Sequence, residues 1–273
     1  MSDSAAEAGA NLTPNAHKCF INTLFWNIHG QNTKTIGNKF ADSDFLSICK
    51  EADILGIVEL HTNEKPSIKG FTLIKDKIRK KNHKGPKISG GVAVFAKAEI
   101  AHMVQHVRTN NEDSIWVKLP KEETGEEADL FVGTCYASPP KRSNKHNPNN
   151  GESDDKHRIL EIFFEEANFF KNQGEVILQG DINARIGIDI DYIEGDKFDN
   201  IFGIVNKTDN QPRNSEDKTT CQRGGVLLDL CRSFDLRIVN GRKPGDLFGS
   251  YTSIQYNGSS VVDYAISSLP VFL

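Results

Sequence analysis

The sequence predicts an α/β fold in which one or two sizeable β-sheets pack with amphipathic helices. Nine short runs are rich in β-branched and aromatic residues, as strands are. Three further segments repeat apolar residues at the i, i+3, i+4 and i+7 spacing of a helix with one buried face. No Gly/Ser-rich linker separates regions of different composition in the 273 residues, so we expect one domain.

The domain is predicted to span residues 18–273. Residues 1–17 are mostly small and polar and have no periodicity, which is typical of a disordered segment. Polar stretches separate the structured runs and predict loops. The predicted strands are residues 20–27, 53–59, 71–75, 90–96, 114–119, 129–136, 175–181, 236–239 and 261–266.

The three predicted helices contain residues 45–52, 160–167 and 227–234. The middle helix is preceded by Ser153, Asp154 and Asp155, which predict an N-cap and an acidic first turn, and it is predicted to end before Gly174. Each helix has one apolar face, so each is expected to cover a sheet.

Composition indicates the cellular compartment in which the chain is expected. The net charge is −4, no run approaches the roughly 18 consecutive apolar residues of a membrane helix, and the first residues lack the layout of a signal peptide. The five cysteines are odd in number and widely spaced, which argues against a disulfide framework. We therefore expect an intracellular chain, nuclear or cytoplasmic, that is neither secreted nor bound to a membrane.

The ends of four predicted strands carry polar side chains: Asn27, Glu59, Tyr136 and Asp181, with Asn183 two residues beyond. Taken singly, each has a plain structural explanation, because Asn and Asp form turns after strands and Tyr is common at a sheet rim. Strand ends and the loops that leave them are also where functional groups collect in sheet-based enzymes. The set, more than any member of it, predicts a site.

The segment Gly180-Asp181-Ile182-Asn183-Ala184 follows a buried apolar strand. Gly180 permits close approach of backbone or ligand, and Asp181 and Asn183 point to one side if the strand continues through them. Carboxylate and amide oxygens suit a hard cation such as Mg²⁺.

With these motifs the chain resembles the endonuclease/exonuclease/phosphatase superfamily. The segment 227–252 is most similar to the endonuclease domain of LINE-type (non-LTR) retrotransposons. The matching motifs occur in the family's order: Trp26-Asn27, Val58-Glu59, Tyr136-Ala137-Ser138-Pro139, Gly180 to Ala184, Tyr251-Thr252 and Val262-Asp263-Tyr264.

The resemblance implies a four-layer αββα sandwich of two packed mixed sheets with outer helices. It also implies hydrolysis of a phosphodiester with Mg²⁺ or Mn²⁺. Carried over by position, Glu59 binds the metal with Asn27 alongside, and Asp181 orients or deprotonates the attacking water, with Asp181 and Asn183 also close to the metal. Asn183 and Tyr136 contact the scissile phosphate. Thr252 contacts the substrate backbone or supports the site, and Asp263 orients the family's catalytic histidine.

The chain departs from the family's pattern after Asp263. The family carries a Ser-Asp-His motif beyond this position, whereas the ten residues that follow it here include neither His nor Asp. We expect a C-terminally truncated domain without its last strand and with weak nuclease activity, because loss of an acid–base histidine costs about 10² to 10⁴ in rate. His29, near the first metal-side motif, and His102 and His106, on a predicted surface helix or loop, do not match the missing position.

A basic segment indicates the partner. Residues 75–87 contain seven Lys or Arg residues and one Asp, a local charge of +6 in a chain of net charge −4. Charge runs are often solvated loops, but a basic loop beside an acidic metal pocket suits a DNA backbone. We expect Arg79, Lys80 and Lys81 to contact DNA, and the protein to act as a monomer.

Two alternatives remain open from the sequence. One keeps the fold but changes the substrate to a phospholipid or an inositol phosphate. The other is a non-catalytic remnant that binds nucleic acid without cutting it.

Overall fold

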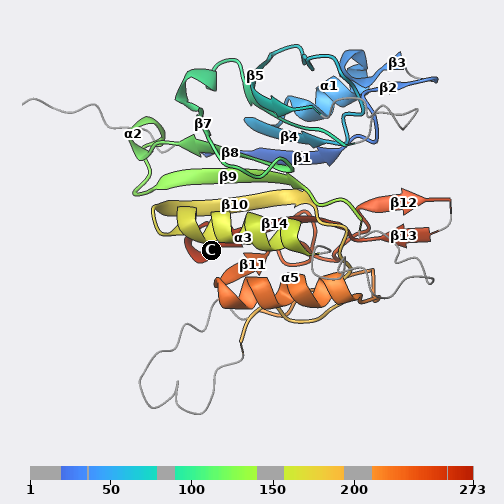
Figure 1. The fold of residues 1–273 in the computed structure, drawn as a ribbon, viewed down its shortest axis with the longest axis vertical. Coiled ribbons are helices and arrows are strands. Elements are labelled where there is room, and N and C mark those ends of the chain that lie inside the picture. Colours follow the sequence, from blue (N-terminus) through green and yellow to red (C-terminus); the bar gives the residue numbers. More distant parts are fainter. Residues whose placement is uncertain are drawn as a thin grey trace, which may run out of the picture.

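The computed structural model describes residues 20–35, 37–78, 90–139, 157–193, 211–256 and 258–272. Within these ranges two mixed β-sheets pack face to face, with helices on their outer faces (Figure 1). The predicted α/β fold with two packed mixed sheets is confirmed. No helix in this part of the chain is both long and apolar enough to cross a membrane.

The first sheet has four strands in the order β1 (Thr23–Asn27), β4 (Ile54–Val58), β6 (Val92–Lys97) and β5 (Phe71–Lys77). The second has six, in the order β11 (Leu236–Ile238), β14 (Asp263–Ser268), β10 (Gly174–Asp181), β9 (Asp129–Tyr136), β8 (Ser114–Leu119) and β7 (Gln105–Val107). The pairs β1–β4 and β9–β10 are parallel, and all other neighbours in these two sheets are antiparallel.

Two short hairpins project from the same side of the molecule, at the right in Figure 1. They are β2 (Asn32–Thr33) with β3 (Gly37–Asn38), and β12 (Ser253–Gln255) with β13 (Gly258–Ser260). The α-helices are α1 (Ser43–Cys49), α2 (Lys121–Thr124), α3 (Arg158–Lys171), α5 (Gln222–Ser233) and α6 (Leu269–Phe272). Two 3-10 helices, η1 (Lys39–Ala41) and η2 (Ala101–Met103), complete the described elements.

All nine predicted strands and all three predicted helices occur, with ends shifted by a few residues. Two local predictions were wrong. His106 lies on β7 rather than on a helix or loop, and α2 forms inside a stretch predicted to be a loop, where Gly125 ends it with a left-handed conformation. Helix α3 begins at Arg158 with His157 as its N-cap, whereas the predicted acidic cap at residues 153–155 falls outside the described residues.

Alternation along the strands separates the core between the sheets from the outer cores. In β4, Ile54 and Val58 face the second sheet, while Leu55 and Ile57 face the opposite way. The second group packs with Phe45 of α1. This follows from the two-residue period of a strand and shows that both faces of β4 are buried, as its continuous apolar sequence predicts.

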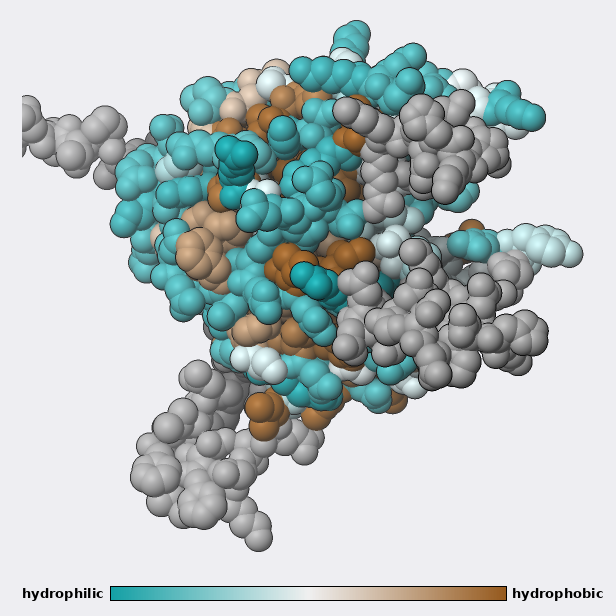
Figure 2. Space-filling view, in the orientation of Figure 1, coloured by the Kyte–Doolittle hydropathy of each residue, from teal (hydrophilic) through white to brown (hydrophobic). Residues whose placement is uncertain are grey.

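The outer face of the six-stranded sheet carries α3 and α5. Trp116 of β8 and Leu178 of β10 pack there with Phe163 of α3 and Leu227 of α5. The face of the molecule in Figure 2 is largely hydrophilic with smaller hydrophobic areas, so most of these apolar side chains lie beneath polar surface.

Adjacent glycines at the start of α5 provide a test of the close packing beneath that helix. A Cβ on Gly224 would lie 2.0 Å from the carbonyl oxygen of Arg185, whereas one on Gly225 would meet nothing within 4 Å. We expect Gly224→Ala to lower the free energy of unfolding by about 1–3 kcal/mol or more through overpacking. Gly225→Ala should raise it by about 0.5–1 kcal/mol, because Ala favours the helix.

Urea unfolding of the two variants measures this difference, and each serves as the control for the other. Equal effects of the two substitutions would contradict the close contact between α5 and the loop at Arg185.

Candidate active site

The candidate site lies where the two sheets present the same edge. Strands β1 and β4 run parallel, so Asn27 at the end of β1 lies near Glu59, which directly follows β4. In the other sheet, Asp181 at the end of β10 pairs with Tyr136 on one side and with Asp263 on the other. The pairing therefore brings the strand ends that the sequence singled out to one edge.

The two-residue period then turns the side chains inward. Phe25 of β1 and Ile177 of β10 pack in the core between the sheets. Asn27 lies two residues after Phe25 and Asp181 lies four residues after Ile177, so both point into the same interspace. Tyr136 belongs to that core as well.

Two hydrogen bonds connect the sheets at this edge. The Asn27 Nδ2 group donates to Asp181 Oδ2 at 2.9 Å, and the Tyr136 hydroxyl donates to Glu59 Oε1 at 2.6 Å. Each bond joins a residue of the four-stranded sheet to a residue of the six-stranded sheet. The carboxylates of Glu59 and Asp181 are therefore held by donors from the opposite sheet.

Asn183 shows that the turn-forming and functional explanations are compatible. Its backbone has φ 51°, and its N–H donates to Asp181 Oδ1 at 3.0 Å, as expected of a turn after a strand. Its side-chain Nδ2 donates to the carbonyl oxygen of Ala137 at 3.1 Å. The turn thus fixes Asn183 beside Asp181 and beside the loop that leaves β9.

Thr252 supports Asp263. Its hydroxyl oxygen accepts hydrogen bonds from the backbone N–H groups of Val262 and Asp263, both at 3.0 Å. These are the contacts of a residue that fixes the start of β14. One carboxylate oxygen of Asp263, Oδ1, is buried and has no hydrogen-bond partner within the described ranges.

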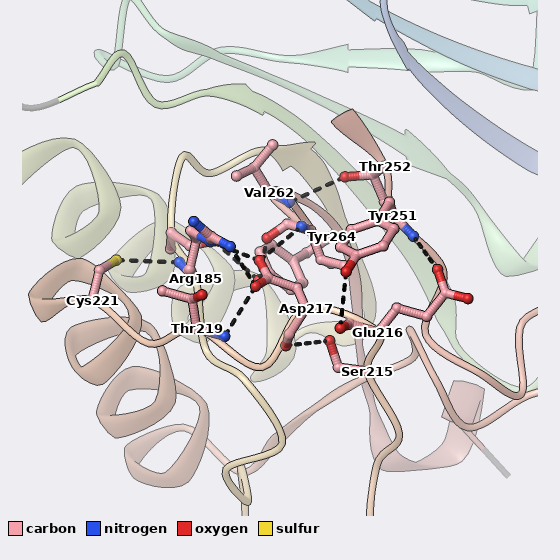
Figure 3. A network of polar contacts seen from close by, with 12 residues as sticks. Arg185, Ser215, Glu216, Asp217, Thr219, Cys221, Tyr251, Thr252, Val262 and Tyr264 are labelled. Atoms are coloured by element: carbon pink, nitrogen blue, oxygen red, sulfur yellow. Dashed lines mark hydrogen bonds and ion pairs between the residues drawn. The ribbon is translucent and has the colours of Figure 1, made fainter. Parts of the chain in front are cut away.

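A polar network around Asp217 anchors the same region (Figure 3). Asp217 accepts from the Arg185 side chain, at 2.7 Å from Nε, and from the backbone N–H of Val261 at 3.1 Å. Next to it, the Tyr251 hydroxyl donates to the carbonyl oxygen of Glu216 at 3.1 Å. The segment before α5 is thereby bound to the residues on either side of the β12–β13 hairpin, which lead to Thr252 and into β14.

Arg223 of α5 likewise binds distant segments together beneath the site. Its buried guanidinium donates to the carbonyl oxygens of Ser138 at 2.8 Å and Ala137 at 3.3 Å, and to that of Ile182 at 3.4 Å. It therefore connects the loops that follow β9 and β10. Nothing in the sequence singled out Arg223, because its partners are backbone groups from distant segments.

Two histidines also lie at the site: His29, which the sequence placed near the first metal-side motif without a role, and His61, which sequence reasoning missed. His29 Nδ1 lies 3.0 Å from Glu59 Oε2, and His61 Nε2 lies 4.0 Å from the same oxygen. The side chain of His29 is 87% exposed and that of His61 is 27% exposed. The sequence contains a pattern that could have indicated both histidines. Asn27 and Glu59, the strand-end residues of the four-stranded sheet, are each followed two positions later by a histidine.

These contacts change the protonation of Glu59 and His61. Burial alone would raise the pKa of Glu59, but the hydrogen bonds to Tyr136 and His29 bring that pKa below its ordinary value. Burial lowers the pKa of His61. At neutral pH Glu59 is thus a carboxylate and His61 is an uncharged imidazole.

The opposite side of the site contains carboxyl groups with raised pKa values. Burial, opposed by the hydrogen bond from Asn27, raises the pKa of Asp181 to about 6. Burial together with the nearby charge of Asp181 raises the pKa of Asp263 to about 7. Perturbed carboxyl groups in a cleft are a mark of functional sites, where a cation or substrate compensates for the buried charge.

The groups open onto a cavity of about 880 Å³ between the sheets, lined by Asn27, His29, Glu59, Asp181, Asn183 and Asp263 among others. Carboxylate and amide oxygens are the donors that a hard divalent cation requires, so the residues fit such an ion. Over the described ranges, no group of three or more His, Cys, Asp or Glu side chains is placed so that it could hold a metal ion by itself, so amide oxygens would have to complete the ligand set.

The predicted DNA-contacting residues Arg79, Lys80 and Lys81 fall outside the described residues. From the same basic segment, Lys77 is described on β5, and its ammonium group donates to the carbonyl oxygen of Asn111. Lys77 is thus turned toward the protein, unlike the solvated position its sequence context suggests.

Residues 24–269 match the family model described as the Endonuclease/Exonuclease/phosphatase family. The chain belongs to this family, whose members are hydrolases that act on phosphodiester bonds and generally depend on a divalent metal. A comparison with curated protein sequences finds no match.

Several solved structures share the fold at 12% sequence identity. One is the 3′ phosphatase NExo from Neisseria bound to a product DNA hairpin, with a TM-score of 0.56 over 93% of this chain and 88% of that one. Another is an AP endonuclease from Archaeoglobus fulgidus, with a TM-score of 0.55 over 93% and 88%. A third is the human nocturnin catalytic domain with bound sulfate, with a TM-score of 0.55 over 91% and 81%.

The raised pKa of Asp263 predicts a pH-dependent effect on stability. Its folded-state pKa of about 7 exceeds the ordinary 3.8, so the protonated carboxyl group is favoured in the folded state. Its contribution to the free energy of unfolding is therefore fully present below about pH 4 and is lost as the pH rises through about 7. Asp263→Asn removes the buried charge. The effect of the substitution on the free energy of unfolding should therefore depend on pH. In EDTA, that effect should be more stabilising at pH 8 than at pH 5, by on the order of 2 kcal/mol.

Urea unfolding at the two pH values measures the effect. Asp229→Asn is the matched control, because Asp229 is 75% exposed on α5 and should show no such difference. The same change at both pH values for Asp263→Asn would show that its carboxyl group is not a buried charge.

Proposed function

We propose that this protein is a metal-dependent phosphodiesterase that nicks DNA, an endonuclease of the retrotransposon type. The observation that carries the proposal is the convergence of Asn27, Glu59, Tyr136, Asp181 and Asn183 at one edge of two sheets. Tyr136 donates to Glu59, and the other four line a single cavity. Family membership supports hydrolysis of a phosphodiester.

The arrangement matches the demands of the reaction. A phosphodiester is already anionic, so hydrolysis requires positive charge near the phosphoryl oxygens, hydrogen-bond donors directed at them, and a base for water. In the proposal Glu59 holds a Mg²⁺ or Mn²⁺ ion, with Asn27 alongside and with Asp181 and Asn183 close to it. When bound, the cation neutralises charge that develops on the phosphoryl group.

Asp181 orients the attacking water and accepts its proton. With a pKa of about 6, this carboxyl group is largely ionised at neutral pH and still basic enough to serve as a general base. The water oxygen forms a bond to phosphorus as the bond to one ester oxygen breaks. The Nδ2 group of Asn183 has a second N–H besides the one that donates to Ala137, and it is the proposed donor to a phosphoryl oxygen. The Tyr136 hydroxyl donates its one hydrogen to Glu59, so its proposed contact with the phosphate requires that bond to be exchanged when substrate binds.

We expect the activity of this chain to be weak. Asp263 is proposed to orient an acid–base histidine, yet its Oδ1 has no hydrogen-bond partner within the described ranges. The leaving oxygen must gain a proton, and where no general acid supplies it the rate falls by about 10² to 10⁴.

Two features favour DNA over a phospholipid or an inositol phosphate. The basic segment 75–87 can neutralise a polyanionic backbone. In addition, Ile254 lines the cavity on the β12–β13 hairpin, and Tyr256 at the turn of this hairpin is fully exposed, so apolar and aromatic surface for unpaired bases lies beside the site. The likeness of residues 227–252 to retrotransposon endonucleases supports the narrower assignment.

Substitution of Asp181 tests the proposal. We expect the chain to nick supercoiled plasmid in Mg²⁺ or Mn²⁺, and Asp181→Asn to reduce the rate by about 10² or more because the base is lost. Asp229→Asn, an exposed change on α5, should leave the rate unchanged. Gel analysis of nicked and supercoiled DNA measures both.

The same preparation separates the alternatives. Phosphate release from phosphoinositide vesicles without nicking would favour a lipid or inositol phosphate substrate. Salt-sensitive DNA binding with no metal-dependent nicking would favour a non-catalytic binding protein. A nicking rate that Asp181→Asn does not change would contradict the assigned base.

Neutralisation of Arg79, Lys80 and Lys81 tests the DNA-contacting segment. Each lysine or arginine that contacts a phosphate contributes nearly one unit to the slope of log K against log salt for duplex DNA. The triple Gln variant should therefore bind DNA more weakly and with a slope flatter by about two to three units. Fluorescence anisotropy over a salt series measures the slope, and an unchanged slope would remove this segment from the interface.

A further inference from the structure

We propose that Glu216 and Asp217 form a clamp that holds both ends of the β12–β13 hairpin, so that the hairpin is a rigid wall of the cavity that positions the DNA strand. Both are positioning residues, because each contacts one end of the hairpin and neither lines the cavity. The inference rests on the proposed function, in which Ile254 and Tyr256 of this hairpin face unpaired bases.

The hairpin has little support of its own. Strands β12 and β13 have three residues each and pair with each other in a separate two-stranded sheet. A hairpin of this size is marginally stable in water when nothing holds it. Its residues Ser253, Ile254 and Gln255 nevertheless line the cavity, and Ile254 is 79% exposed. Its orientation over the cavity must therefore be fixed mainly by contacts at its two ends.

Glu216 holds the end at which the chain enters the hairpin (Figure 3). The hydroxyl of Tyr251 donates to the carbonyl oxygen of Glu216 at 3.1 Å, and the Tyr251 N–H donates to Glu216 Oε2 at 3.3 Å. The Glu216 N–H donates in turn to the carbonyl oxygen of Gly249 at 2.9 Å. Three hydrogen bonds thus join Glu216 to the segment that leads into β12.

Asp217 holds the end at which the chain leaves the hairpin. Its Oδ2 atom accepts from the N–H of Val261, which directly follows β13, at 3.1 Å. Arg185 donates to both carboxylate oxygens of Asp217, at 2.7 Å from Nε and 2.5 Å from Nη2. Burial alone would raise the pKa of Asp217, but the hydrogen bond from Arg185 brings that pKa below its ordinary value. Asp217 is therefore a carboxylate at neutral pH, and charged acceptors form the stronger hydrogen bonds.

Close packing at the entry to the hairpin is an independent sign of rigidity. Gly249 has φ 65°, and a Cβ atom there would lie 2.2 Å from the carbonyl oxygen of Asn214. The Asn214 side chain also donates to the carbonyl oxygen of Leu247 at 2.8 Å. The segments 214–217 and 247–251 are therefore in direct contact, and a rotation at Gly249 would disrupt that contact.

Asp217 also connects the hairpin to the active site. Arg185 lies two residues after Asn183, and Val261 lies two residues before Asp263. A wall that is ordered before binding loses less conformational entropy when DNA is bound. Loosening of the hairpin should therefore weaken substrate binding more than it slows the chemical step.

The experiment compares two conservative variants of the full chain. Tyr251→Phe retains the ring and removes one hydrogen bond to Glu216, and Asp217→Asn removes the charge that Arg185 and Val261 share. By NMR, the backbone order parameters of β12 should fall from about 0.85 to about 0.6 or below in Asp217→Asn, and by a smaller amount in Tyr251→Phe. Those of β10 should not change.

Nicking kinetics give the second measurement. Tyr251→Phe should raise KM by about three- to tenfold, the effect of one lost hydrogen bond, and should change kcat by less than about twofold. Asp217→Asn should raise KM by about tenfold or more and also lower kcat, because Arg185 loses its charged partner. Asp229→Asn, an exposed change on α5, is the matched control and should change neither quantity. A purely structural role would instead lower the active fraction, and hence kcat, at constant KM.

The outcomes separate this inference from the proposed function. Unchanged order in the hairpin of both variants would overturn the clamp, whether or not the chain cuts DNA. Lower order without a rise in KM would show that the hairpin does not position DNA, and would overturn the inference while nicking stands. Wild-type protein that neither binds nor nicks DNA would overturn the proposed function and the substrate role of the hairpin, while the order parameters still decide on the clamp. Because Tyr251→Phe preserves the pair of Arg185 and Asp217, the inference remains testable even if Asp217→Asn fails to fold.

Discussion

The site depends on the register of three strands in the six-stranded sheet. Asp181 pairs with Tyr136 on the parallel strand β9 and with Asp263 on the antiparallel strand β14. A shift of any one strand by a single residue would turn its side chain to the opposite face, toward the outer helices. The buried alternation of apolar residues in β9, β10 and β14 therefore fixes the site as firmly as it fixes the core.

This placement has an energetic cost that a ligand can offset. Asp181 and Asp263 are paired neighbours on adjacent strands, and burial raises the pKa values of both. Repulsion adds to the increase, from the charge of Glu59 at Asp181 and from the charge of Asp181 at Asp263. Ionisation of the pair weakens the folded state without a cation, because buried charge of one sign is destabilising. A positive ion bound in the cavity would relieve this repulsion, so the feature that lowers stability also favours cation binding.

The sequence predicted much of the fold because long strands such as β4 and β9 show apolar periodicity that local chemistry dictates. It predicted the candidate residues at strand ends because parallel strands bring their carboxyl ends to one edge. The hairpins and β7 were missed, since runs of two or three residues contain too little periodicity. Arg223 and the Asp217 network were also missed, because the partners that matter lie 32 or more residues away and are largely backbone groups.

The division of the site between two sheets explains why no single element carries its chemistry. The four-stranded sheet supplies Glu59, the residue proposed to hold the cation, with His29 Nδ1 3.0 Å from its carboxylate. The six-stranded sheet supplies Asp181 and Tyr136, which form the proposed water and phosphate side. The residues of both sides lie at the ends of strands, so the backbones that carry them are separated by the spacing of packed sheets, about 10 Å. Side chains that reach inward from each sheet shorten the gap between the functional groups. The hydrogen bond from Asn27 to Asp181 spans that interval, so the packing of the core between the sheets sets the distance between cation and base.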